Sequence, residues 1–207
     1  FNSAGNFHAA APPGGIRMSY GLTAETSRTL PPGRVHGVGL TGPILWRRKD
    51  WWKVEVTVAG RDERPHDGQT REIGNLLLPV GSRDTALRAL WLVVPDLCVP
   101  DPDTLLAQAL TGRDDDGVGN PQAPAGSAER GFVRLSRRGR IFRPLTWRRA
   151  AIALTDTCVI IRHGRWRRQV SVIPYERIQS LNVQRGPLDR RLSLASLRFD
   201  MVAREVP

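Results

Sequence analysis

The chain has 207 residues, enough for one large domain or two small ones, and 40% of them are apolar, as in a folded globular protein. The formal net charge of +11 comes from the second part: residues 1–126 carry 13 basic and 14 acidic side chains, whereas residues 127–207 carry 18 and 6. No run approaches the roughly 18 to 20 apolar residues of a membrane span, and no signal peptide is recognised, so this polypeptide is expected to be soluble by itself.

Residues 1–98 are expected to form a first module of short strands closed by one helix. Trp52, Val54 and Val56 alternate with other residues, as in a strand with one buried face. Ser82 is a favourable N-cap, and apolar residues recur at helical spacing from there to Pro95, which predicts a helix over 82–94. The predicted strands lie at 15–23, 26–30, 35–40, 52–58 and 72–78.

Residues 99–130 are expected to connect this module to a second one. A short helix is predicted at 101–110, and residues 111–130 are rich in Gly, Pro, Ala and Asp, which is typical of a flexible linker. The acidic run of Asp114, Asp115 and Asp116 lacks the alternating spacing of a calcium loop. It is therefore expected to be a solvated run.

Residues 131–207 are expected to form the second module, with strands at 132–141, 150–154, 158–162, 167–173, 178–183 and 196–202. Residues 15–60 align with residues 158–203 without a gap, at a constant offset of 143, which predicts two copies of one β-rich unit. No counterpart of the 82–94 helix follows, so the second copy is expected to expose apolar residues or to borrow the helix at 101–110. The identical pairs are Gly21 and Gly164, Pro31 and Pro174, Arg34 and Arg177, Leu45 and Leu188, Arg47 and Arg190, and Arg48 and Arg191.

The second copy also carries a recognisable series of motifs. A Leu-Thr-Asp strand leads into an apolar strand that ends at Gly164, then a basic strand, and then Ile-Pro-Tyr-Glu-Arg-Ile-Gln-Ser at 173–180. This series resembles the bacterial pleckstrin-homology-like family of the YdbS/YdbT type. The first copy is similar to a Trp-rich variant of the same module, although it has Pro-Gly-Arg-Val-His-Gly at 32–37, and residues 76–91 resemble the module's last strand and helix.

The resemblance implies a mainly β fold with some α: two pleckstrin-homology-like curled sheets or half-barrels, the first closed by its C-terminal helix and the second truncated. Members of the family are integral membrane proteins whose modules lie on the cytoplasmic side. The resemblance therefore implies a soluble part of a longer protein at the cell membrane, attached through spans outside this sequence. Its function is expected to be non-catalytic binding of a protein partner or of the anionic inner leaflet.

Arginine and tryptophan gather in three places, and these are the candidate membrane or partner contacts. Such clusters suit an anionic interface, where tryptophan lies at headgroup depth and each nearby cation adds about 1 kcal/mol. The alternative is that Trp52 and one neighbour fill the core while the cations face water. Further basic stretches contain Arg162 and run from Arg137 to Arg149. The candidate contacts are Trp46, Arg47, Arg48, Trp51, Arg165, Trp166, Arg167, Arg168, Arg190 and Arg191.

Two other classes of function remain as alternatives. A nucleic-acid-binding module needs aromatic residues on an open sheet or a recognition helix, and the sequence displays neither. An undetected enzyme is the third reading, although the four histidines are scattered and the motifs of hydrolases, P-loop proteins and zinc proteases do not occur. The sequence thus predicts no catalytic residue, metal site, cofactor or small-molecule substrate, and it predicts that Cys98 and Cys158 are buried thiols.

Overall fold

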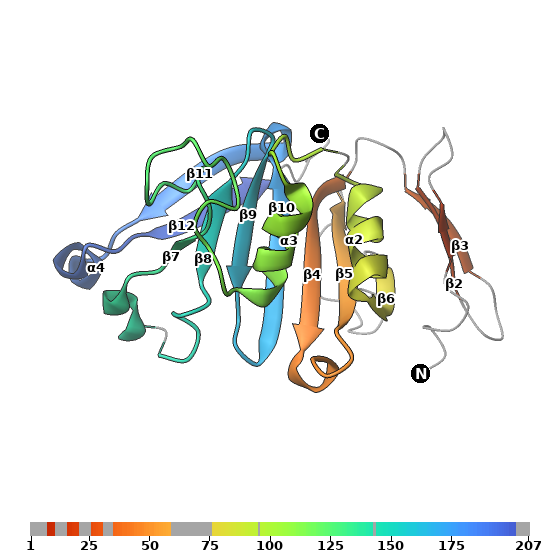
Figure 1. Ribbon diagram of the computed structural model, residues 1–207, viewed down its shortest axis with the longest axis horizontal. Helices are drawn as coiled ribbons and strands as arrows, with labels where there is room; N and C mark the ends of the chain where they lie inside the picture. Colours follow the sequence, from red (N-terminus) through yellow and green to blue (C-terminus); the bar gives the residue numbers. More distant parts are fainter. Residues whose placement is uncertain are drawn as a thin grey trace, which may run out of the picture. The chain divides into compact units, whose positions relative to one another are not determined.

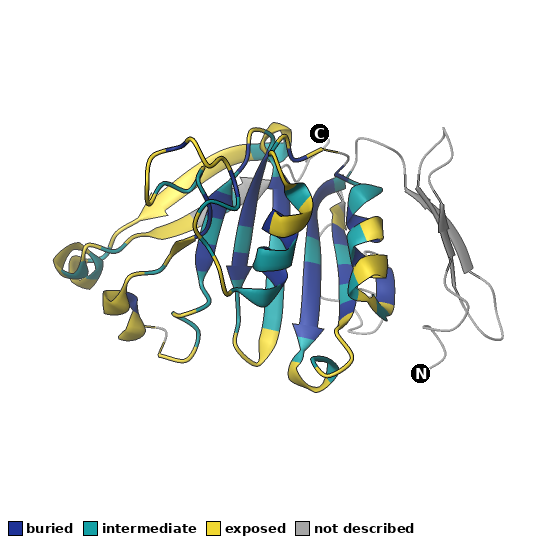
Figure 2. Ribbon diagram, in the orientation of Figure 1, coloured by how far each residue is buried: buried dark blue, intermediate teal, exposed yellow. Residues whose placement is uncertain are grey.

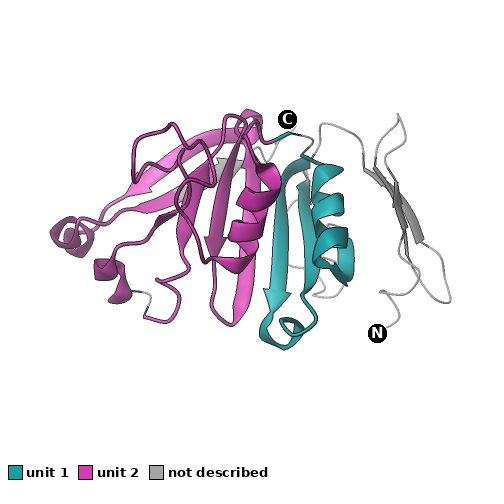
Figure 3. Cartoon of the chain, in the orientation of Figure 1, with its two compact units in different colours: residues 1–96, 203–207 teal, residues 97–202 magenta. Residues whose placement is uncertain are grey.

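The computed structural model describes residues 8–10, 16–20, 26–30, 35–58, 76–94, 96–142 and 144–201 (Figure 1). The chain divides into two compact units, residues 1–96 with 203–207 and residues 97–202 (Figure 3). The fold is mainly β with few helices, which confirms the predicted class. The described strands pair in an antiparallel manner, and they form open sheets rather than a closed barrel.

Unit 1 contains two groups of paired strands and a helix. Strand β2 lies between β1 and β3, and β5 lies between β4 and β6. The helix, α2, packs against β5 and β6. The elements are β1 (His8–Ala10), β2 (Ile16–Tyr20), β3 (Thr26–Leu30), β4 (Val35–Pro43), η2 (Ile44–Trp46), β5 (Trp51–Val58), β6 (Leu76–Ser82) and α2 (Arg83–Trp91).

The strand and helix patterns of unit 1 have the expected physical causes. The alternation in β5 places Trp52, Val54 and Val56 in the core, each at most 2% exposed. Ser82 caps α2 by accepting a hydrogen bond from the backbone N–H of Thr85 at 3.3 Å. The predicted helix is therefore confirmed, and its Leu90 is fully buried.

Unit 2 is built on four antiparallel strands in the order β10-β9-β8-β7, with α3 packed on β9 and β10 and a β11–β12 hairpin beyond them. Helix α3 lies where a helix was predicted at 101–110, between an Asp101 N-cap and a left-handed Gly112. The elements are α3 (Pro102–Thr111), β7 (Val133–Arg134), η3 (Arg137–Arg140), β8 (Ala151–Leu154), β9 (Cys158–His163), β10 (Arg167–Pro174), η4 (Tyr175–Arg177), β11 (Ile178–Gln184), α4 (Pro187–Leu192) and β12 (Ser196–Met201).

Two stretches of unit 2 differ from the prediction. The strand expected at 132–141 is only two residues long, because the chain turns into η3 and packs Gly139 against Leu135, whose Cδ2 lies 2.6 Å from where a Cβ would be. The stretch expected to be a flexible linker is held by backbone bonds from Gly119 to Arg130 and from Phe132 to Asp115. These are main-chain hydrogen bonds, and the composition of the stretch does not reveal which groups pair.

Two strand pairs of unit 2 have the same register as two strand pairs of unit 1 when residue numbers are shifted by 143. The Cα partners in β9–β10 and in β11–β12 are those of β2–β3 and β4–β5 with 143 added to each number. A register irregularity between Val35 and Gly37 has its counterpart between Ile178 and Ser180. Gly21 and Pro31, expected at the same turns as Gly164 and Pro174, lie outside the described residues. Matching partners are Arg17 and Thr29 with Ile160 and Val172, and Val38 and Val56 with Leu181 and Phe199.

Candidate functional site

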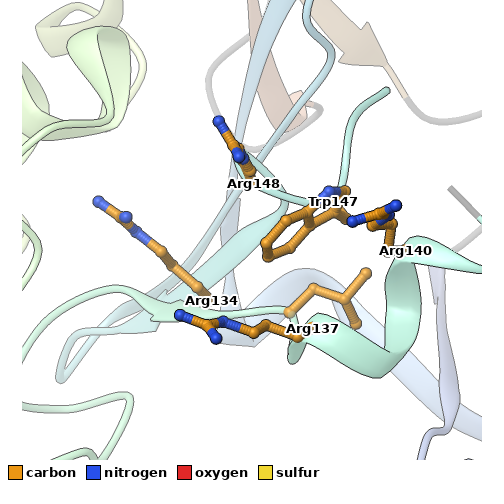
Figure 4. A pocket seen from close by; sticks show the side chains of 6 residues that line it. Arg134, Arg137, Arg140, Trp147 and Arg148 are labelled. Atoms are coloured by element: carbon orange, nitrogen blue, oxygen red, sulfur yellow. The ribbon is translucent and has the colours of Figure 1, made fainter. Parts of the chain in front are cut away.

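An arginine-lined pocket of about 640 Å³ lies between β7, η3 and the segment that precedes β8. Figure 4 shows four arginine side chains arranged around the indole of Trp147. The lining residues are Arg134, Leu135, Arg137, Arg140, Trp147 and Arg148. All of them come from unit 2.

The local sequence explains why cations gather here. Between Glu129 and Asp156 the chain contains eight arginines and no acidic residue. The η3 turn presents Arg137 and Arg140 on its exposed surface, and β7 ends at Arg134 on the other side of the pocket. A concave site lined by one sign of charge concentrates its field and raises the local concentration of anions.

The pocket cations differ in how they are balanced. Arg134 is anchored, because its Nε pairs with the Asp115 carboxylate and its Nη2 donates to the carbonyl of Arg113 at 2.7 Å. The guanidinium of Arg148 lies 5.5 Å from the centroid of the Trp147 ring. Among the ion pairs found in the described part of the chain, none involves Arg137, Arg140 or Arg148.

Apolar side chains stand exposed on the same connection between η3 and β8. Ile141 is 70% exposed, Phe142 48% and Leu145 54%. Phenylalanine, leucine and isoleucine are normally buried, so three exposed residues within five positions, directly beside a cationic pocket, indicate an interaction surface. The basic stretch was visible in the sequence, but the turn that makes it concave and leaves its apolar residues uncovered was not.

Two arginines of the basic stretches are instead bound to other parts of unit 2, and one of them is buried. Arg162 is fully buried, stacks over the Phe132 ring at 4.4 Å, and donates to the Asp115 carboxylate at 2.6 Å. Arg149 donates to three carbonyls at the end of α3, including that of Leu110 at 2.6 Å. Arg162 is therefore not accessible to a surface partner, and the expectation that Asp115 belongs to a solvated acidic run is wrong. A buried charge needs a partner, and tertiary packing brings these two together.

The first predicted cluster lies in unit 1, on the turn between β4 and β5. Trp46 and Arg47 are half-buried and Arg48 is exposed. Trp51 is 38% exposed with the Lys49 ammonium 4.8 Å from its ring, whereas the adjacent Trp52 is buried. The alternative considered for this cluster, in which Trp52 enters the core and cations face water, describes Trp52 and Arg48 well.

The other two predicted clusters lie in unit 2, at different turns. Arg165, Trp166 and Arg167 are exposed at the β9–β10 turn, with Trp166 60% exposed, and Arg168 is half-buried at the start of β10. Arg190 and Arg191 are exposed in the last turn of α4, within the β11–β12 connection. The structure thus distributes the ten predicted contacts over three separate turns, and none of them lines the arginine pocket.

Other kinds of site were sought in the described ranges. No cluster of three metal-ligating side chains occurs in them. Among the same residues, no helix has the length and apolar character needed to cross a membrane. Cys158 is buried as predicted, but Cys98 is exposed.

These features define a mainly β module with a basic surface pocket. Residues 131–207 match the family described as Bacterial PH domain, which is the family that the sequence resembles. This match supports a non-catalytic module. Comparison with curated proteins and with solved structures found no match.

Proposed function

We propose that the bacterial PH domain at 131–207 binds an anionic membrane surface through the arginine pocket and the apolar connection beside it. The main support for this proposal is that four arginines surround Trp147 and that three apolar side chains are exposed within the five adjoining residues. Lipid phosphates supply the anions, and the acyl boundary covers the apolar side chains. The proposal implies a location at the cytoplasmic face of the cell membrane, where anionic lipids give a negative surface potential.

Arginine suits this task better than lysine would. A guanidinium donates two parallel hydrogen bonds to a phosphate, and its planar face stacks on an aromatic ring. Trp147 is half-buried, so its ring forms a wall of the pocket while leaving the cations accessible. The three pocket arginines without an ion pair among the described residues are Arg137, Arg140 and Arg148.

The experiment is co-sedimentation of the full chain with vesicles of phosphatidylcholine, with or without phosphatidylglycerol. We expect binding to the acidic vesicles only, and it should weaken as salt rises, because the Debye length shrinks from about 10 Å at 0.1 M to about 3 Å at 1 M. Replacing Arg137, Arg140 and Arg148 together by Gln removes up to roughly 3 kcal/mol at about 1 kcal/mol per cation, or about two decades in affinity.

A matched control separates the pocket from general positive charge. Replacing Arg165, Arg167 and Arg168 by Gln removes the same number of charges from another turn of the same unit. This control variant should weaken vesicle binding much less. Phe142→Ser keeps every charge and should lower binding to acidic vesicles at all salt concentrations. Equal binding to neutral and acidic vesicles, or equal loss in the two triple variants, contradicts the proposal.

A further inference from the structure

The β11–β12 hairpin carries an exposed apolar face that does not involve the arginine pocket. Residues Leu181 and Val183 alternate along β11, and their partners across the hairpin are Phe199 and Leu197. Directly paired residues share a face, so these four side chains lie together. Leu181 and Val183 are each 53% exposed and Leu197 is 49% exposed. Figure 2 shows this hairpin exposed along most of its length, whereas β9 is largely buried.

The equivalent hairpin of unit 1 buries the same positions. With the offset of 143, Leu181, Val183 and Leu197 correspond to Val38, Leu40 and Val54, which are at most 2% exposed. The register of the two hairpins is the same, and so is the position of the irregularity near the start of β4 and of β11. The short helices within the two connections also begin at equivalent residues, Ile44 for η2 and Pro187 for α4.

In unit 1, a strand and a helix complete this hairpin. Strand β6 pairs with the outer edge of β5, with Leu78 opposite Val54, and α2 then packs on β5 and β6. The segment is strongly apolar where it meets the sheet, since Leu77 and Leu90 are fully buried. In the described part of unit 2, β11 is the strand paired with β12. The second hairpin therefore presents a face and an edge that match a strand followed by an amphipathic helix.

We propose that the β11–β12 hairpin docks a segment of a partner polypeptide, in which an extended aliphatic strand adds to the edge of β12 and an amphipathic helix follows. Strand addition at an edge supplies backbone hydrogen bonds, and side-chain contacts on the face supply specificity. By the offset, the incoming strand pairs beside Leu197, as β6 pairs beside Val54.

The charge around the hairpin specifies the partner further. Ser82, at the junction of β6 and α2, pairs with Trp51, which corresponds to residue 194 directly after α4. The docked helix accordingly begins beside α4, whose last turn carries the exposed Arg190 and Arg191. Acidic residues are favoured at a helix N-terminus, and here they also meet these two cations. The partner segment is thus aliphatic in its strand and acidic in the first helical turn.

The probe is a labelled peptide that has the sequence of residues 76–91 with the substitution Arg83→Glu. It is titrated with the full chain in a fluorescence anisotropy assay. We expect saturable binding of the peptide to the wild-type chain. The affinity should fall about tenfold or more in Leu181→Lys and in Leu197→Lys, because each change removes an apolar contact worth at least about one decade in affinity. Arg190→Gln with Arg191→Gln should weaken binding and reduce its salt dependence. Hydrogen exchange should show new protection in β12.

Matched controls make the result specific. Leu145→Lys places the same charge at an equally exposed apolar residue outside the hairpin, and it should leave peptide binding unchanged. A peptide with Asp in place of Leu77 should not bind. The proposal is overturned if the labelled peptide does not bind the wild-type chain, or if protection appears away from β12. It is also overturned if Leu181→Lys instead abolishes self-association of the chain or binding to acidic vesicles, since a second copy or a lipid surface then covers this face.

Discussion

Replacing the counter-ion of the buried arginine should severely destabilise unit 2. Arg162 is 0% exposed, and its charge is balanced by Asp115, whose side chain is 12% exposed. In Asp115→Asn the guanidinium stays buried without its counter-charge, which costs about 3 to 5 kcal/mol. That is a fifth or more of the roughly 5 to 15 kcal/mol by which a domain is stable.

The magnitude follows from the contacts of the pair. Arg162 also donates to the carbonyls of Gln108 at 3.1 Å and Arg149 at 3.2 Å, so Asp115→Asn leaves hydrogen bonds but removes the charge balance. In the double variant with Arg162→Met, both charges disappear, and the total loss should be smaller than the sum of the single losses by about 1 to 3 kcal/mol. Arg134 pairs with the same carboxylate but is 46% exposed, so Arg134→Gln should cost only about 0 to 1 kcal/mol.

The assay is urea unfolding of the full chain followed by circular dichroism, which yields the free energy of unfolding for the four proteins and the wild type. If Asp115→Asn does not fold at all, the double variant should restore folding. The reasoning is refuted if Asp115→Asn unfolds within about 1 kcal/mol of the wild type, or if the two single losses add without coupling.

Three further predictions concern single elements of the two units, and each uses urea unfolding with a matched control. Gly164→Ala should destabilise far more than Gly126→Ala: both glycines have φ near +80°, but a Cβ at 164 meets the Arg167 carbonyl oxygen whereas one at 126 meets nothing within 4 Å, so equal losses contradict the close approach. Trp52→Ala should cost about 3 to 5 kcal/mol and Trp51→Ala less than about 1, since only Trp52 is buried, and the reverse order would place the wrong tryptophan in the core. The hydrogen bond from Thr104 lowers the pKa of Asp101, so this cap stabilises α3 above the ordinary pKa of 3.8, and its contribution is lost as the pH falls through the lowered value. Asp101→Asn should remove that part of the acid sensitivity of unfolding, while Asp103→Asn should leave it. Unchanged acid sensitivity in Asp101→Asn contradicts the assignment.

The sequence by itself determined the local elements and the pairing of neighbouring strands. Alternation in β5 and the Ser82 cap of α2 depend on residues close together in the chain, and the 143-residue offset compares two such local patterns with each other. These patterns predict structure because backbone geometry repeats with a fixed period. The motifs around Gly164 were enough to identify the family that residues 131–207 match.

Only the tertiary structure decided which charges are used inside and which face solvent. Nothing in the local pattern distinguishes Arg162 from Arg165, yet the first is buried on Asp115, 47 residues away, and the second is exposed. The arginine pocket exists because η3 turns where a strand was expected, bringing Arg137 and Arg140 toward Trp147. Burial and electrostatic pairing depend on distances in space between residues far apart in the chain, and a periodic pattern along the chain carries no information about those distances.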